Sequence, residues 1–278
     1  MMTRTGFLGA VGRLFVWSFL LALVVVVAYP LLWMVMNGFK TNAELFGNPF
    51  ALPLQLDWEN YADAWNRGVS DYLTASILVT VTSTVATVFI SAWAAYGLTR
   101  VRMPFGRVVS GLILGGLMLA PAVALVPLVR MFQAMGLYNT FWALLILYTA
   151  FRIPFTTFLI RAYMIDLPRE VDEAAEVDGA SRWTTFWRIT LPMCKPIITS
   201  TIILHVLFAW NEYLFAMVFT SGTEVQTLPV GLTSLMSKHG TDYPVVFAGM
   251  VVAALPVIVL FFASQRYFIK GLSEGIGK

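Results

Sequence analysis

Residues 167–192 read LPREVDEAAEVDGASRWTTFWRITLP and form the longest charged stretch in an otherwise apolar chain. The pattern predicts two short helices. Pro168 suits the first turn of a helix, where its missing N–H needs no partner, and Gly179 suits the stop, where the left-handed conformation is common. Ser181 can cap a second helix, which Pro192 is expected to end.

The first of these two helices has unlike faces. At 100° per residue, Val171, Ala174 and Ala175 fall on one side, and the other side carries the acidic residues Glu170, Asp172, Glu173 and Glu176. A solvated helix with a small, flat alanine face suits a groove on another protein. The same helix could instead lie on the membrane surface, and the pattern alone leaves both interpretations open.

The composition around this stretch is that of a membrane protein. Charged residues make up 12% of the 278 residues and the mean hydropathy is +0.77, whereas soluble domains carry about 25% charged residues. No composition shift or long linker divides the chain, so we expect a single transmembrane domain over residues 1–278. The net charge of +3 needs no nucleic-acid partner, and Cys194, the one cysteine, excludes an intrachain disulfide or a cysteine metal cluster.

Six apolar runs are long enough to cross a bilayer of about 30 Å as helices. The distribution of Lys and Arg places the N-terminus inside, because the outside segments then hold only Lys40, Arg67, Arg130 and Lys238. The fold class is therefore an all-α membrane protein with both termini and the loop 161–196 in the cytoplasm. The predicted spans are residues 14–36, 72–99, 108–129, 139–160, 197–220 and 244–265, followed by a cytoplasmic tail, 266–278.

Small residues and prolines predict details of these spans. Ser83, Thr87, Ser91 and Ala95 recur every four residues, which favours close helix packing over the lining of a polar path. Pro121 and Pro127 suggest a bent or broken outer end of the third span. A short helix is expected near residues 60–65.

Polar residues in the fourth and fifth spans need water, a partner or a functional reason, because a buried charge is costly in a bilayer. Two interpretations stay open. In one, Arg152 binds carbonyls freed by Pro154, while Asn211 and Glu212 bond between helices. In the other, hydrogen-bonding groups beside aromatic rings line a sugar path, formed by Arg152, Trp210, Asn211, Glu212 and Tyr213.

The charged stretch resembles the EAA signature of bacterial ABC importer permeases, with Glu173-Ala174-Ala175, then Gly179, then Ile189-x-Leu191-Pro192 at the family's spacing. Further features are similar to the carbohydrate-importer branch, the maltose-type inner-membrane permeases. They are the six-segment layout, Asp178-Gly179-Ala180-Ser181, Trp210-Asn211-Glu212-Tyr213, and the tail from Gln265 to Leu272.

The resemblance implies a multi-pass subunit of a prokaryotic inner membrane that imports a sugar or oligosaccharide. A second homologous permease, a dimer of ABC ATPase subunits that holds ATP and Mg, and an extracytoplasmic solute-binding protein are the implied partners. The first helix of the charged stretch, which is called the coupling helix in this family, would dock in a cleft of the ATPase. The docking residues would be Glu170, Val171, Glu173, Ala174, Ala175, Asp178, Gly179 and Ala180. The tail would reach the ATPase through Lys270, Gly271 and Ser273.

Other function classes are less well supported. His205 and His239 lie in a span and an outside loop, so no catalytic dyad or metal set is visible, and no enzyme activity, cofactor or metal site is expected of this chain. No Walker A sequence is present, so any ATP hydrolysis belongs to another subunit. A secondary transporter would show internal repeats, and none is convincing. A polyol or glycerol phosphate remains an alternative cargo.

Overall fold

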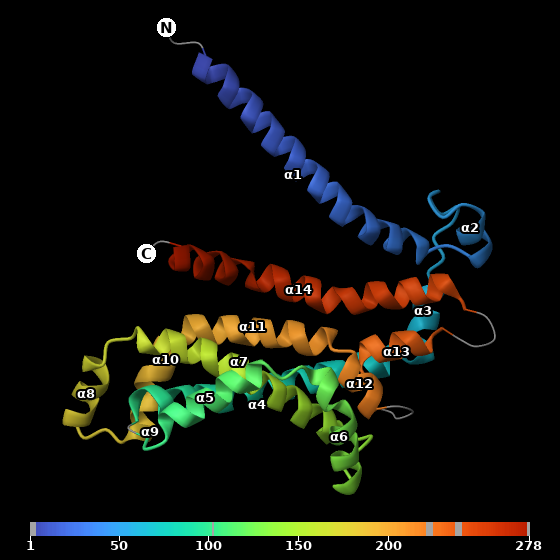
Figure 1. Ribbon diagram of the computed structural model, residues 1–278. Coiled ribbons are helices and arrows are strands. Elements are labelled where there is room, and N and C mark those ends of the chain that lie inside the picture. Colours follow the sequence, from blue (N-terminus) through green and yellow to red (C-terminus); the bar gives the residue numbers. More distant parts are fainter. Residues whose placement is uncertain (1–3, 102, 221–224, 237–240, 277–278) are drawn as a thin grey trace. The chain divides into compact units, whose positions relative to one another are not determined.

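The computed structural model describes residues 4–101, 103–220, 225–236 and 241–276, with side chains described between Gly12 and Ser264 (Figure 1). The described residues form helices and loops, with no strand among them. Helices are expected in a bilayer because each satisfies its backbone hydrogen bonds within one segment. The all-α prediction is confirmed.

Four described helices are long and apolar enough to span a membrane, and two strongly bent helix pairs would raise the number to six. The chain divides into two compact units, residues 1–69 with 232–255 and residues 70–231 with 256–278. Each unit is described separately below.

The first unit contains α1 (Arg4–Asn37), whose uncharged run matches the first predicted span, and a loop region that closes on itself. The buried Lys40 ammonium donates to the carbonyls of Asn48 and Pro49, each at 3.2 Å, and the Asn60 amide donates to the carbonyls of Gly38 and Lys40. The short elements here are α2 (Asn42–Gly47), α3 (Glu59–Ala64) and the π-helical turn η1 (Trp65–Val69). The helix predicted near residues 60–65 is therefore confirmed.

The last helix of the chain, α14 (Tyr243–Ile276), begins in the first unit. Asn42 fixes this beginning because its amide donates to Asp242 and its oxygen accepts from the backbone N–H of Tyr243, both at 3.2 Å. Trp33 meets Phe247 edge-on at 5.2 Å between ring centroids. A short helix, α13 (Leu228–Ser234), lies on the boundary of the two units in sequence.

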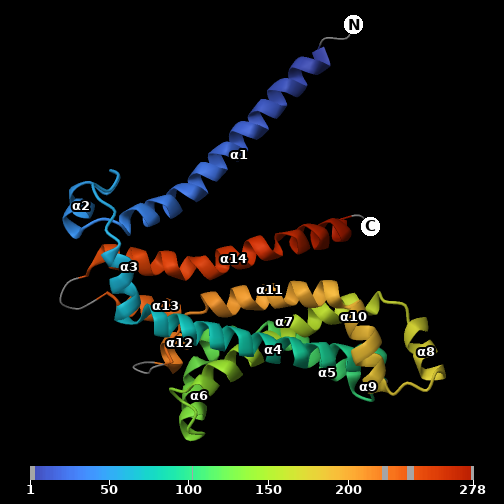
Figure 2. The same ribbon diagram turned by 180° about the vertical axis from the view of Figure 1, so that it is seen from behind.

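The second unit is built on α4 (Ser70–Arg100), α7 (Phe141–Ile165) and α11 (Lys195–Asn211), which run side by side in both views (Figures 1 and 2). The stripe predicted for close packing faces the inside of this bundle. Its four members, Ser83, Thr87, Ser91 and Ala95, are fully buried. Ser91 donates to the carbonyl of Ile153 on α7. Small side chains thus let α4 and α7 approach closely, as the spacing indicated.

The third predicted span, residues 108–129, is divided into α5 (Gly106–Leu117) and α6 (Pro121–Ala134), which meet at 102°. Pro121 stands in the first turn of α6, so the proline that suggested a break begins the second segment. A Cβ on Gly116 would lie 2.9 Å from Cγ of Pro154, so glycine is needed where α5 crosses α7.

The fifth predicted span, residues 197–220, is also not one helix. The chain leaves helical geometry after Asn211 and resumes it in α12 (Leu214–Phe219). The fourth predicted span is one helix, α7, which continues through both Arg152 and Pro154.

Candidate functional site

The charged loop between α7 and α11 folds into short helices at the end of α4 that is remote from α6 and α12 (Figures 1 and 2). They are α8 (Glu170–Val177), α9 (Arg182–Thr185), the π-helical turn η2 (Phe186–Thr190) and α10 (Leu191–Met193).

Gly179 ends α8 in the left-handed conformation, with φ of +77°, and Ser181 caps α9 by accepting from the N–H of Thr184. Both predictions are confirmed. The predicted role of Pro168 is wrong, because this residue precedes α8 and Arg169 occupies the N-cap. The second loop helix runs through α9, η2 and α10 and ends at Met193, directly after Pro192, as predicted to within one residue.

The faces of α8 differ from those that the sequence predicted. Ala175 is buried, and Val171 and Asp172 are partly buried against the chain itself. Ala174 is exposed, and Val177 is 88% exposed. The outward face therefore combines Ala174 and Val177 with acidic residues, Glu170, Glu173 and Glu176. Among the other predicted docking residues, Asp178 and Gly179 are exposed and Ala180 is partly buried.

Asp172 turns inward because it pairs with Arg100, the last residue of α4. Nε of Arg100 lies 2.9 Å from Oδ2 of Asp172, and the two side chains are 6% and 18% exposed. Nε has no aligned hydrogen-bond acceptor, so the contact is a close ion pair. Arg100 also donates through a terminal nitrogen to the carbonyl of Leu167, and Thr190 donates to Oδ1 of Asp172 at 3.0 Å.

The second loop helix packs on the same end of α4. Tyr96 donates to the carbonyl of Arg182, and the ring of Trp93 contacts those of Trp183 and Phe186. Beneath them lies a buried cluster that also holds the fully buried Cys194, together with Ala92, Ala95, Tyr96, Ile160, Met164 and Phe186. The loop helices are thus part of the folded unit and not an independent surface segment.

A second polar site lies where α11 gives way to α12. The Glu212 carboxylate accepts from the N–H groups of Phe215 at 2.9 Å and Ala216 at 3.1 Å, and from the Tyr148 hydroxyl at 2.8 Å. These contacts satisfy free N–H groups at the start of α12 and join it to α7. The structural interpretation of Glu212, a bond between helices, is therefore supported.

The neighbours of Glu212 have different surroundings. Trp210 is buried, whereas Asn211 and Tyr213 are exposed. The Asn211 amide donates to the carbonyl of Leu207 in its own helix, so the predicted bond between helices is absent for this residue. Asn211 and Tyr213 are the two residues of the predicted sugar path that present side chains to the outside of the described chain.

Arg152 is held by aromatic rings. Its guanidinium carbon lies 4.8 Å from the ring centre of Phe155 and 4.5 Å from that of Phe208, which is cation–π geometry. Its Nε is buried without a hydrogen-bond partner, so no bond to a carbonyl freed by Pro154 forms there. Among the described residues Arg152 makes no ion pair, and Glu212 is engaged elsewhere. His205 is fully buried and its Nε2 lies 3.2 Å from Oγ of Ser83.

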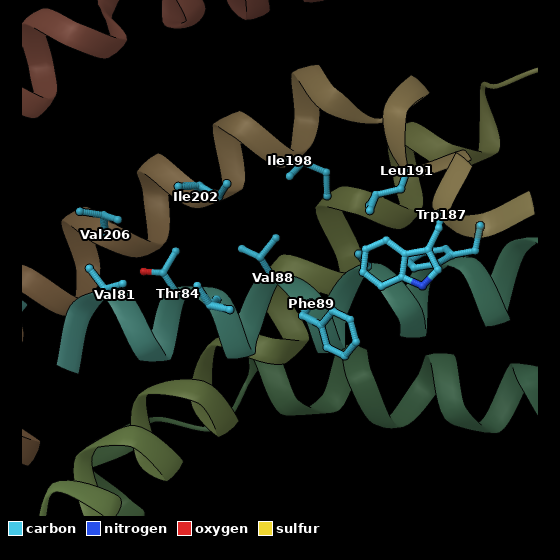
Figure 3. A pocket seen from close by; sticks show the side chains of 12 residues that line it. Val81, Thr84, Val88, Phe89, Trp187, Leu191, Ile198, Ile202 and Val206 are labelled. Carbon is cyan, nitrogen blue, oxygen red and sulfur yellow. The ribbon is translucent and has the colours of Figure 1, made fainter. Parts of the chain in front are cut away.

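An apolar groove of about 430 Å³ separates part of α4 from α11 (Figure 3). Its one hydroxyl, on Thr84, is already bonded to the carbonyl of Thr80. Besides this hydroxyl, the indole N–H of Trp187 is the one further polar side-chain group in the lining. The groove could therefore satisfy few of the hydroxyl groups of a sugar and is poorly suited to carry one. The lining residues are Val81, Thr84, Val85, Val88, Phe89, Ala92, Phe186, Trp187, Leu191, Ile198, Ile202 and Val206.

The predicted tail continues α14 as a helix to Ile276. The surroundings of Lys270, Gly271 and Ser273 lie outside the described part, and so does His239. Sequence reasoning missed Arg100, Tyr148 and Thr190. In the sequence, Arg100 contributes only to the Lys and Arg count that predicts membrane orientation, and neither Tyr148 nor Thr190 stands in a motif.

The known proteins that are similar to this chain are inner-membrane transport permeases. Residues 87–274 match the family described as binding-protein-dependent transport system inner membrane component. A probable ABC transporter permease, YurM of Bacillus subtilis, is 44% identical and covers 95% of this chain and 88% of its own. The diacetylchitobiose uptake permease NgcG of Streptomyces coelicolor is 34% identical, with 90% and 84% covered.

A solved structure has the same fold. It is a bacterial ABC transporter involved in the import of the acidic polysaccharide alginate, and one of its chains superposes with a TM-score of 0.80 at 23% identity. The match covers 96% of this chain and 99% of that one. The family match and the permease relatives show that the chain is a member of the carbohydrate ABC importer family of inner-membrane permeases.

Proposed function

We propose that this chain is the transmembrane permease subunit of an ATP-driven importer for a sugar or oligosaccharide. The observation that carries the proposal is the exposed face of α8. It presents Ala174 and Val177 beside Glu170 and Glu173 at the end of a helix bundle, within a loop of the EAA pattern. An apolar strip rimmed by acids fits a groove that is apolar at its centre and basic at its edge.

The protein that supplies this groove would be the cytoplasmic ATPase, and α8 would occupy it. Glu173, Ala174, Asp178 and Gly179 are exposed and would contact the ATPase directly. Ala175, and Val171 in part, would support the docking face from within, because they pack against the chain itself. ATP and Mg would bind to the partner ATPase, and closure of its dimer would displace α8.

The remaining assembly follows from the family. A second homologous permease would complete the pathway, and an extracytoplasmic binding protein would deliver the cargo. The end of α14, with Lys270, Gly271 and Ser273, would reach the ATPase. The whole chain would act as one transmembrane domain in which each bent helix pair counts as one span, which gives six spans. An even number of spans would put both termini on the same side, and the distribution of Lys and Arg favours the cytoplasm.

For the cargo path, Asn211 and Tyr213 are the best-placed candidates because both are exposed. Glu212 and Arg152 would shape the path indirectly, one by holding the start of α12 and the other by its place between two rings. The named cargoes of the relatives, diacetylchitobiose and alginate, support an oligosaccharide.

The test is purification from the native membrane followed by reconstitution. An ATPase subunit should co-purify, and vesicles should accumulate a labelled oligosaccharide only with ATP and a binding protein. Uptake driven by an ion gradient without ATP would contradict the proposal. As a control, an ATPase variant that cannot hydrolyse ATP should abolish uptake while leaving the complex intact.

A further inference from the structure

The structure assigns to Arg100 a positioning role: its buried ion pair with Asp172 ties the coupling helix α8 to the end of α4, so that the span moves with the helix. This inference rests on the proposed function, because it specifies how a movement of α8 would reach the membrane.

The pair is placed at a junction of three segments. Arg100 is the last residue of α4, Asp172 lies in the first turn of α8, and Thr190 closes η2. The two oxygens of Asp172 are divided between the other two residues, with Oδ2 at 2.9 Å from Arg100 and Oδ1 at 3.0 Å from Thr190. The carboxylate of Asp172 therefore connects α8 and η2 to each other and to the end of α4.

Arg100 is held more firmly than an exposed basic residue would be. Its side chain is 6% exposed, and a terminal nitrogen donates to the carbonyl of Leu167, which precedes α8. Arg169 donates in the reverse direction, to the carbonyl of Thr99 on α4, at 3.4 Å. Two arginines thus cross the gap between α4 and the segment that begins α8.

Burial raises the free-energy cost of breaking the pair. A paired charge removed from water cannot be released without leaving its partner uncompensated, so breaking one member is costly. An exposed pair would instead slip with little change in free energy. The acids on the outward face of α8 are free to meet a partner, while Asp172 alone faces inward.

A buried apolar cluster lies at the same end of α4. Tyr96, Met164 and Phe186 belong to it, and all three are buried. Packed side chains of this kind transmit displacement because the interior has little free volume. The ion pair fixes the position of α8 along α4, since a sliding of α8 would separate the two charges.

The test uses the complete importer in vesicles. Arg100→Gln and Asp172→Asn should each keep the ATPase bound and hydrolysing, yet lower the cargo moved per ATP by about tenfold, as expected when one charge-assisted contact is lost. The exchange of both charges, Arg100→Asp with Asp172→Arg, should recover part of the lost coupling. Arg107→Gln and Asp166→Asn make the same two changes at exposed positions, so they serve as matched controls and should transport normally.

Arg100→Lys guards against simple misfolding. Lysine keeps the positive charge but lacks the planar guanidinium and its several N–H donors. The variant should therefore assemble normally and move an intermediate amount of cargo per ATP hydrolysed. Normal coupling in both single variants would overturn the inference, as would an exchanged pair no better than the single variants. Absence of an ATPase from the unmodified complex would contradict the proposed function instead.

Discussion

Single residues set the geometry of both polar sites. Gly179 takes φ of +77° at the end of α8, and a Cβ built on it meets nothing within 4 Å of the chain. Within the chain, glycine is therefore favoured by its backbone conformation and not by crowding. An approaching ATPase would add a second requirement, that of space.

Substitutions at Gly179 separate these two requirements. Asn tolerates the left-handed conformation, whereas Val does not. If only the backbone matters, Gly179→Asn should transport almost normally and Gly179→Val should fail. If the ATPase approaches closely, both should weaken co-purification of the ATPase, which can be measured by its ratio to the permease on a gel. Equal and normal transport by both variants would contradict any special role for this glycine.

Glu212 illustrates how a motif residue can be structural. Its carboxylate serves two backbone N–H groups and the Tyr148 hydroxyl. We expect Glu212→Ala to lower the free energy of unfolding by about 1–2 kcal/mol, as for loss of a helix cap. Tyr148→Phe should cost about 1 kcal/mol, as for one lost hydrogen bond. Thermal unfolding of the purified permease in detergent measures both.

Asn211→Ala provides the matched comparison. This side chain is exposed and bonds only within its own helix, so its loss should leave the unfolding midpoint nearly unchanged. If Asn211 lies on the sugar path, the same variant should change the apparent affinity for cargo. A stability loss in Asn211→Ala as large as that in Glu212→Ala would contradict this division of roles.

At the scale of helices, the sequence predicted what local rules govern. The apolar runs, the small-residue stripe, the cap at Ser181 and the stop at Gly179 follow from spacing and backbone preference. The break after Asn211 was missed because no proline or glycine marks it. The inward turn of Asp172 was missed because Arg100, remote in sequence, determines it.

The stripe on α4 makes a further prediction about helix packing. Ala95 is fully buried beside Ile160 and Met164, so Ala95→Leu should overpack the contact between α4 and α7 and cost about 1–3 kcal/mol. Ala94→Leu, the same change at a partly exposed neighbour, should cost much less. Thermal unfolding of the two variants in detergent gives the comparison, and equal midpoints would contradict the packing argument.

At the scale of the whole molecule, the distribution of Lys and Arg predicts the orientation in the membrane. A reporter that is active only in the cytoplasm should work when fused after residue 278. One that is active only outside should work when inserted at Leu54, which is 86% exposed in the loop before α3. Asn60, nearby, is a poor insertion site because it binds two carbonyls. Activity of the outside reporter at the C-terminus would contradict the predicted topology.

Cys194 gives the molecule a practical property. It is the only thiol of the chain and is fully buried beneath the loop helices. Maleimides and similar reagents act on thiolates that water can reach. A cysteine introduced at an exposed position, such as Val177 or Leu54, would therefore take up nearly all of a water-soluble label. The natural sequence already offers the low background that fluorescence and spin-label experiments usually obtain by removing native cysteines.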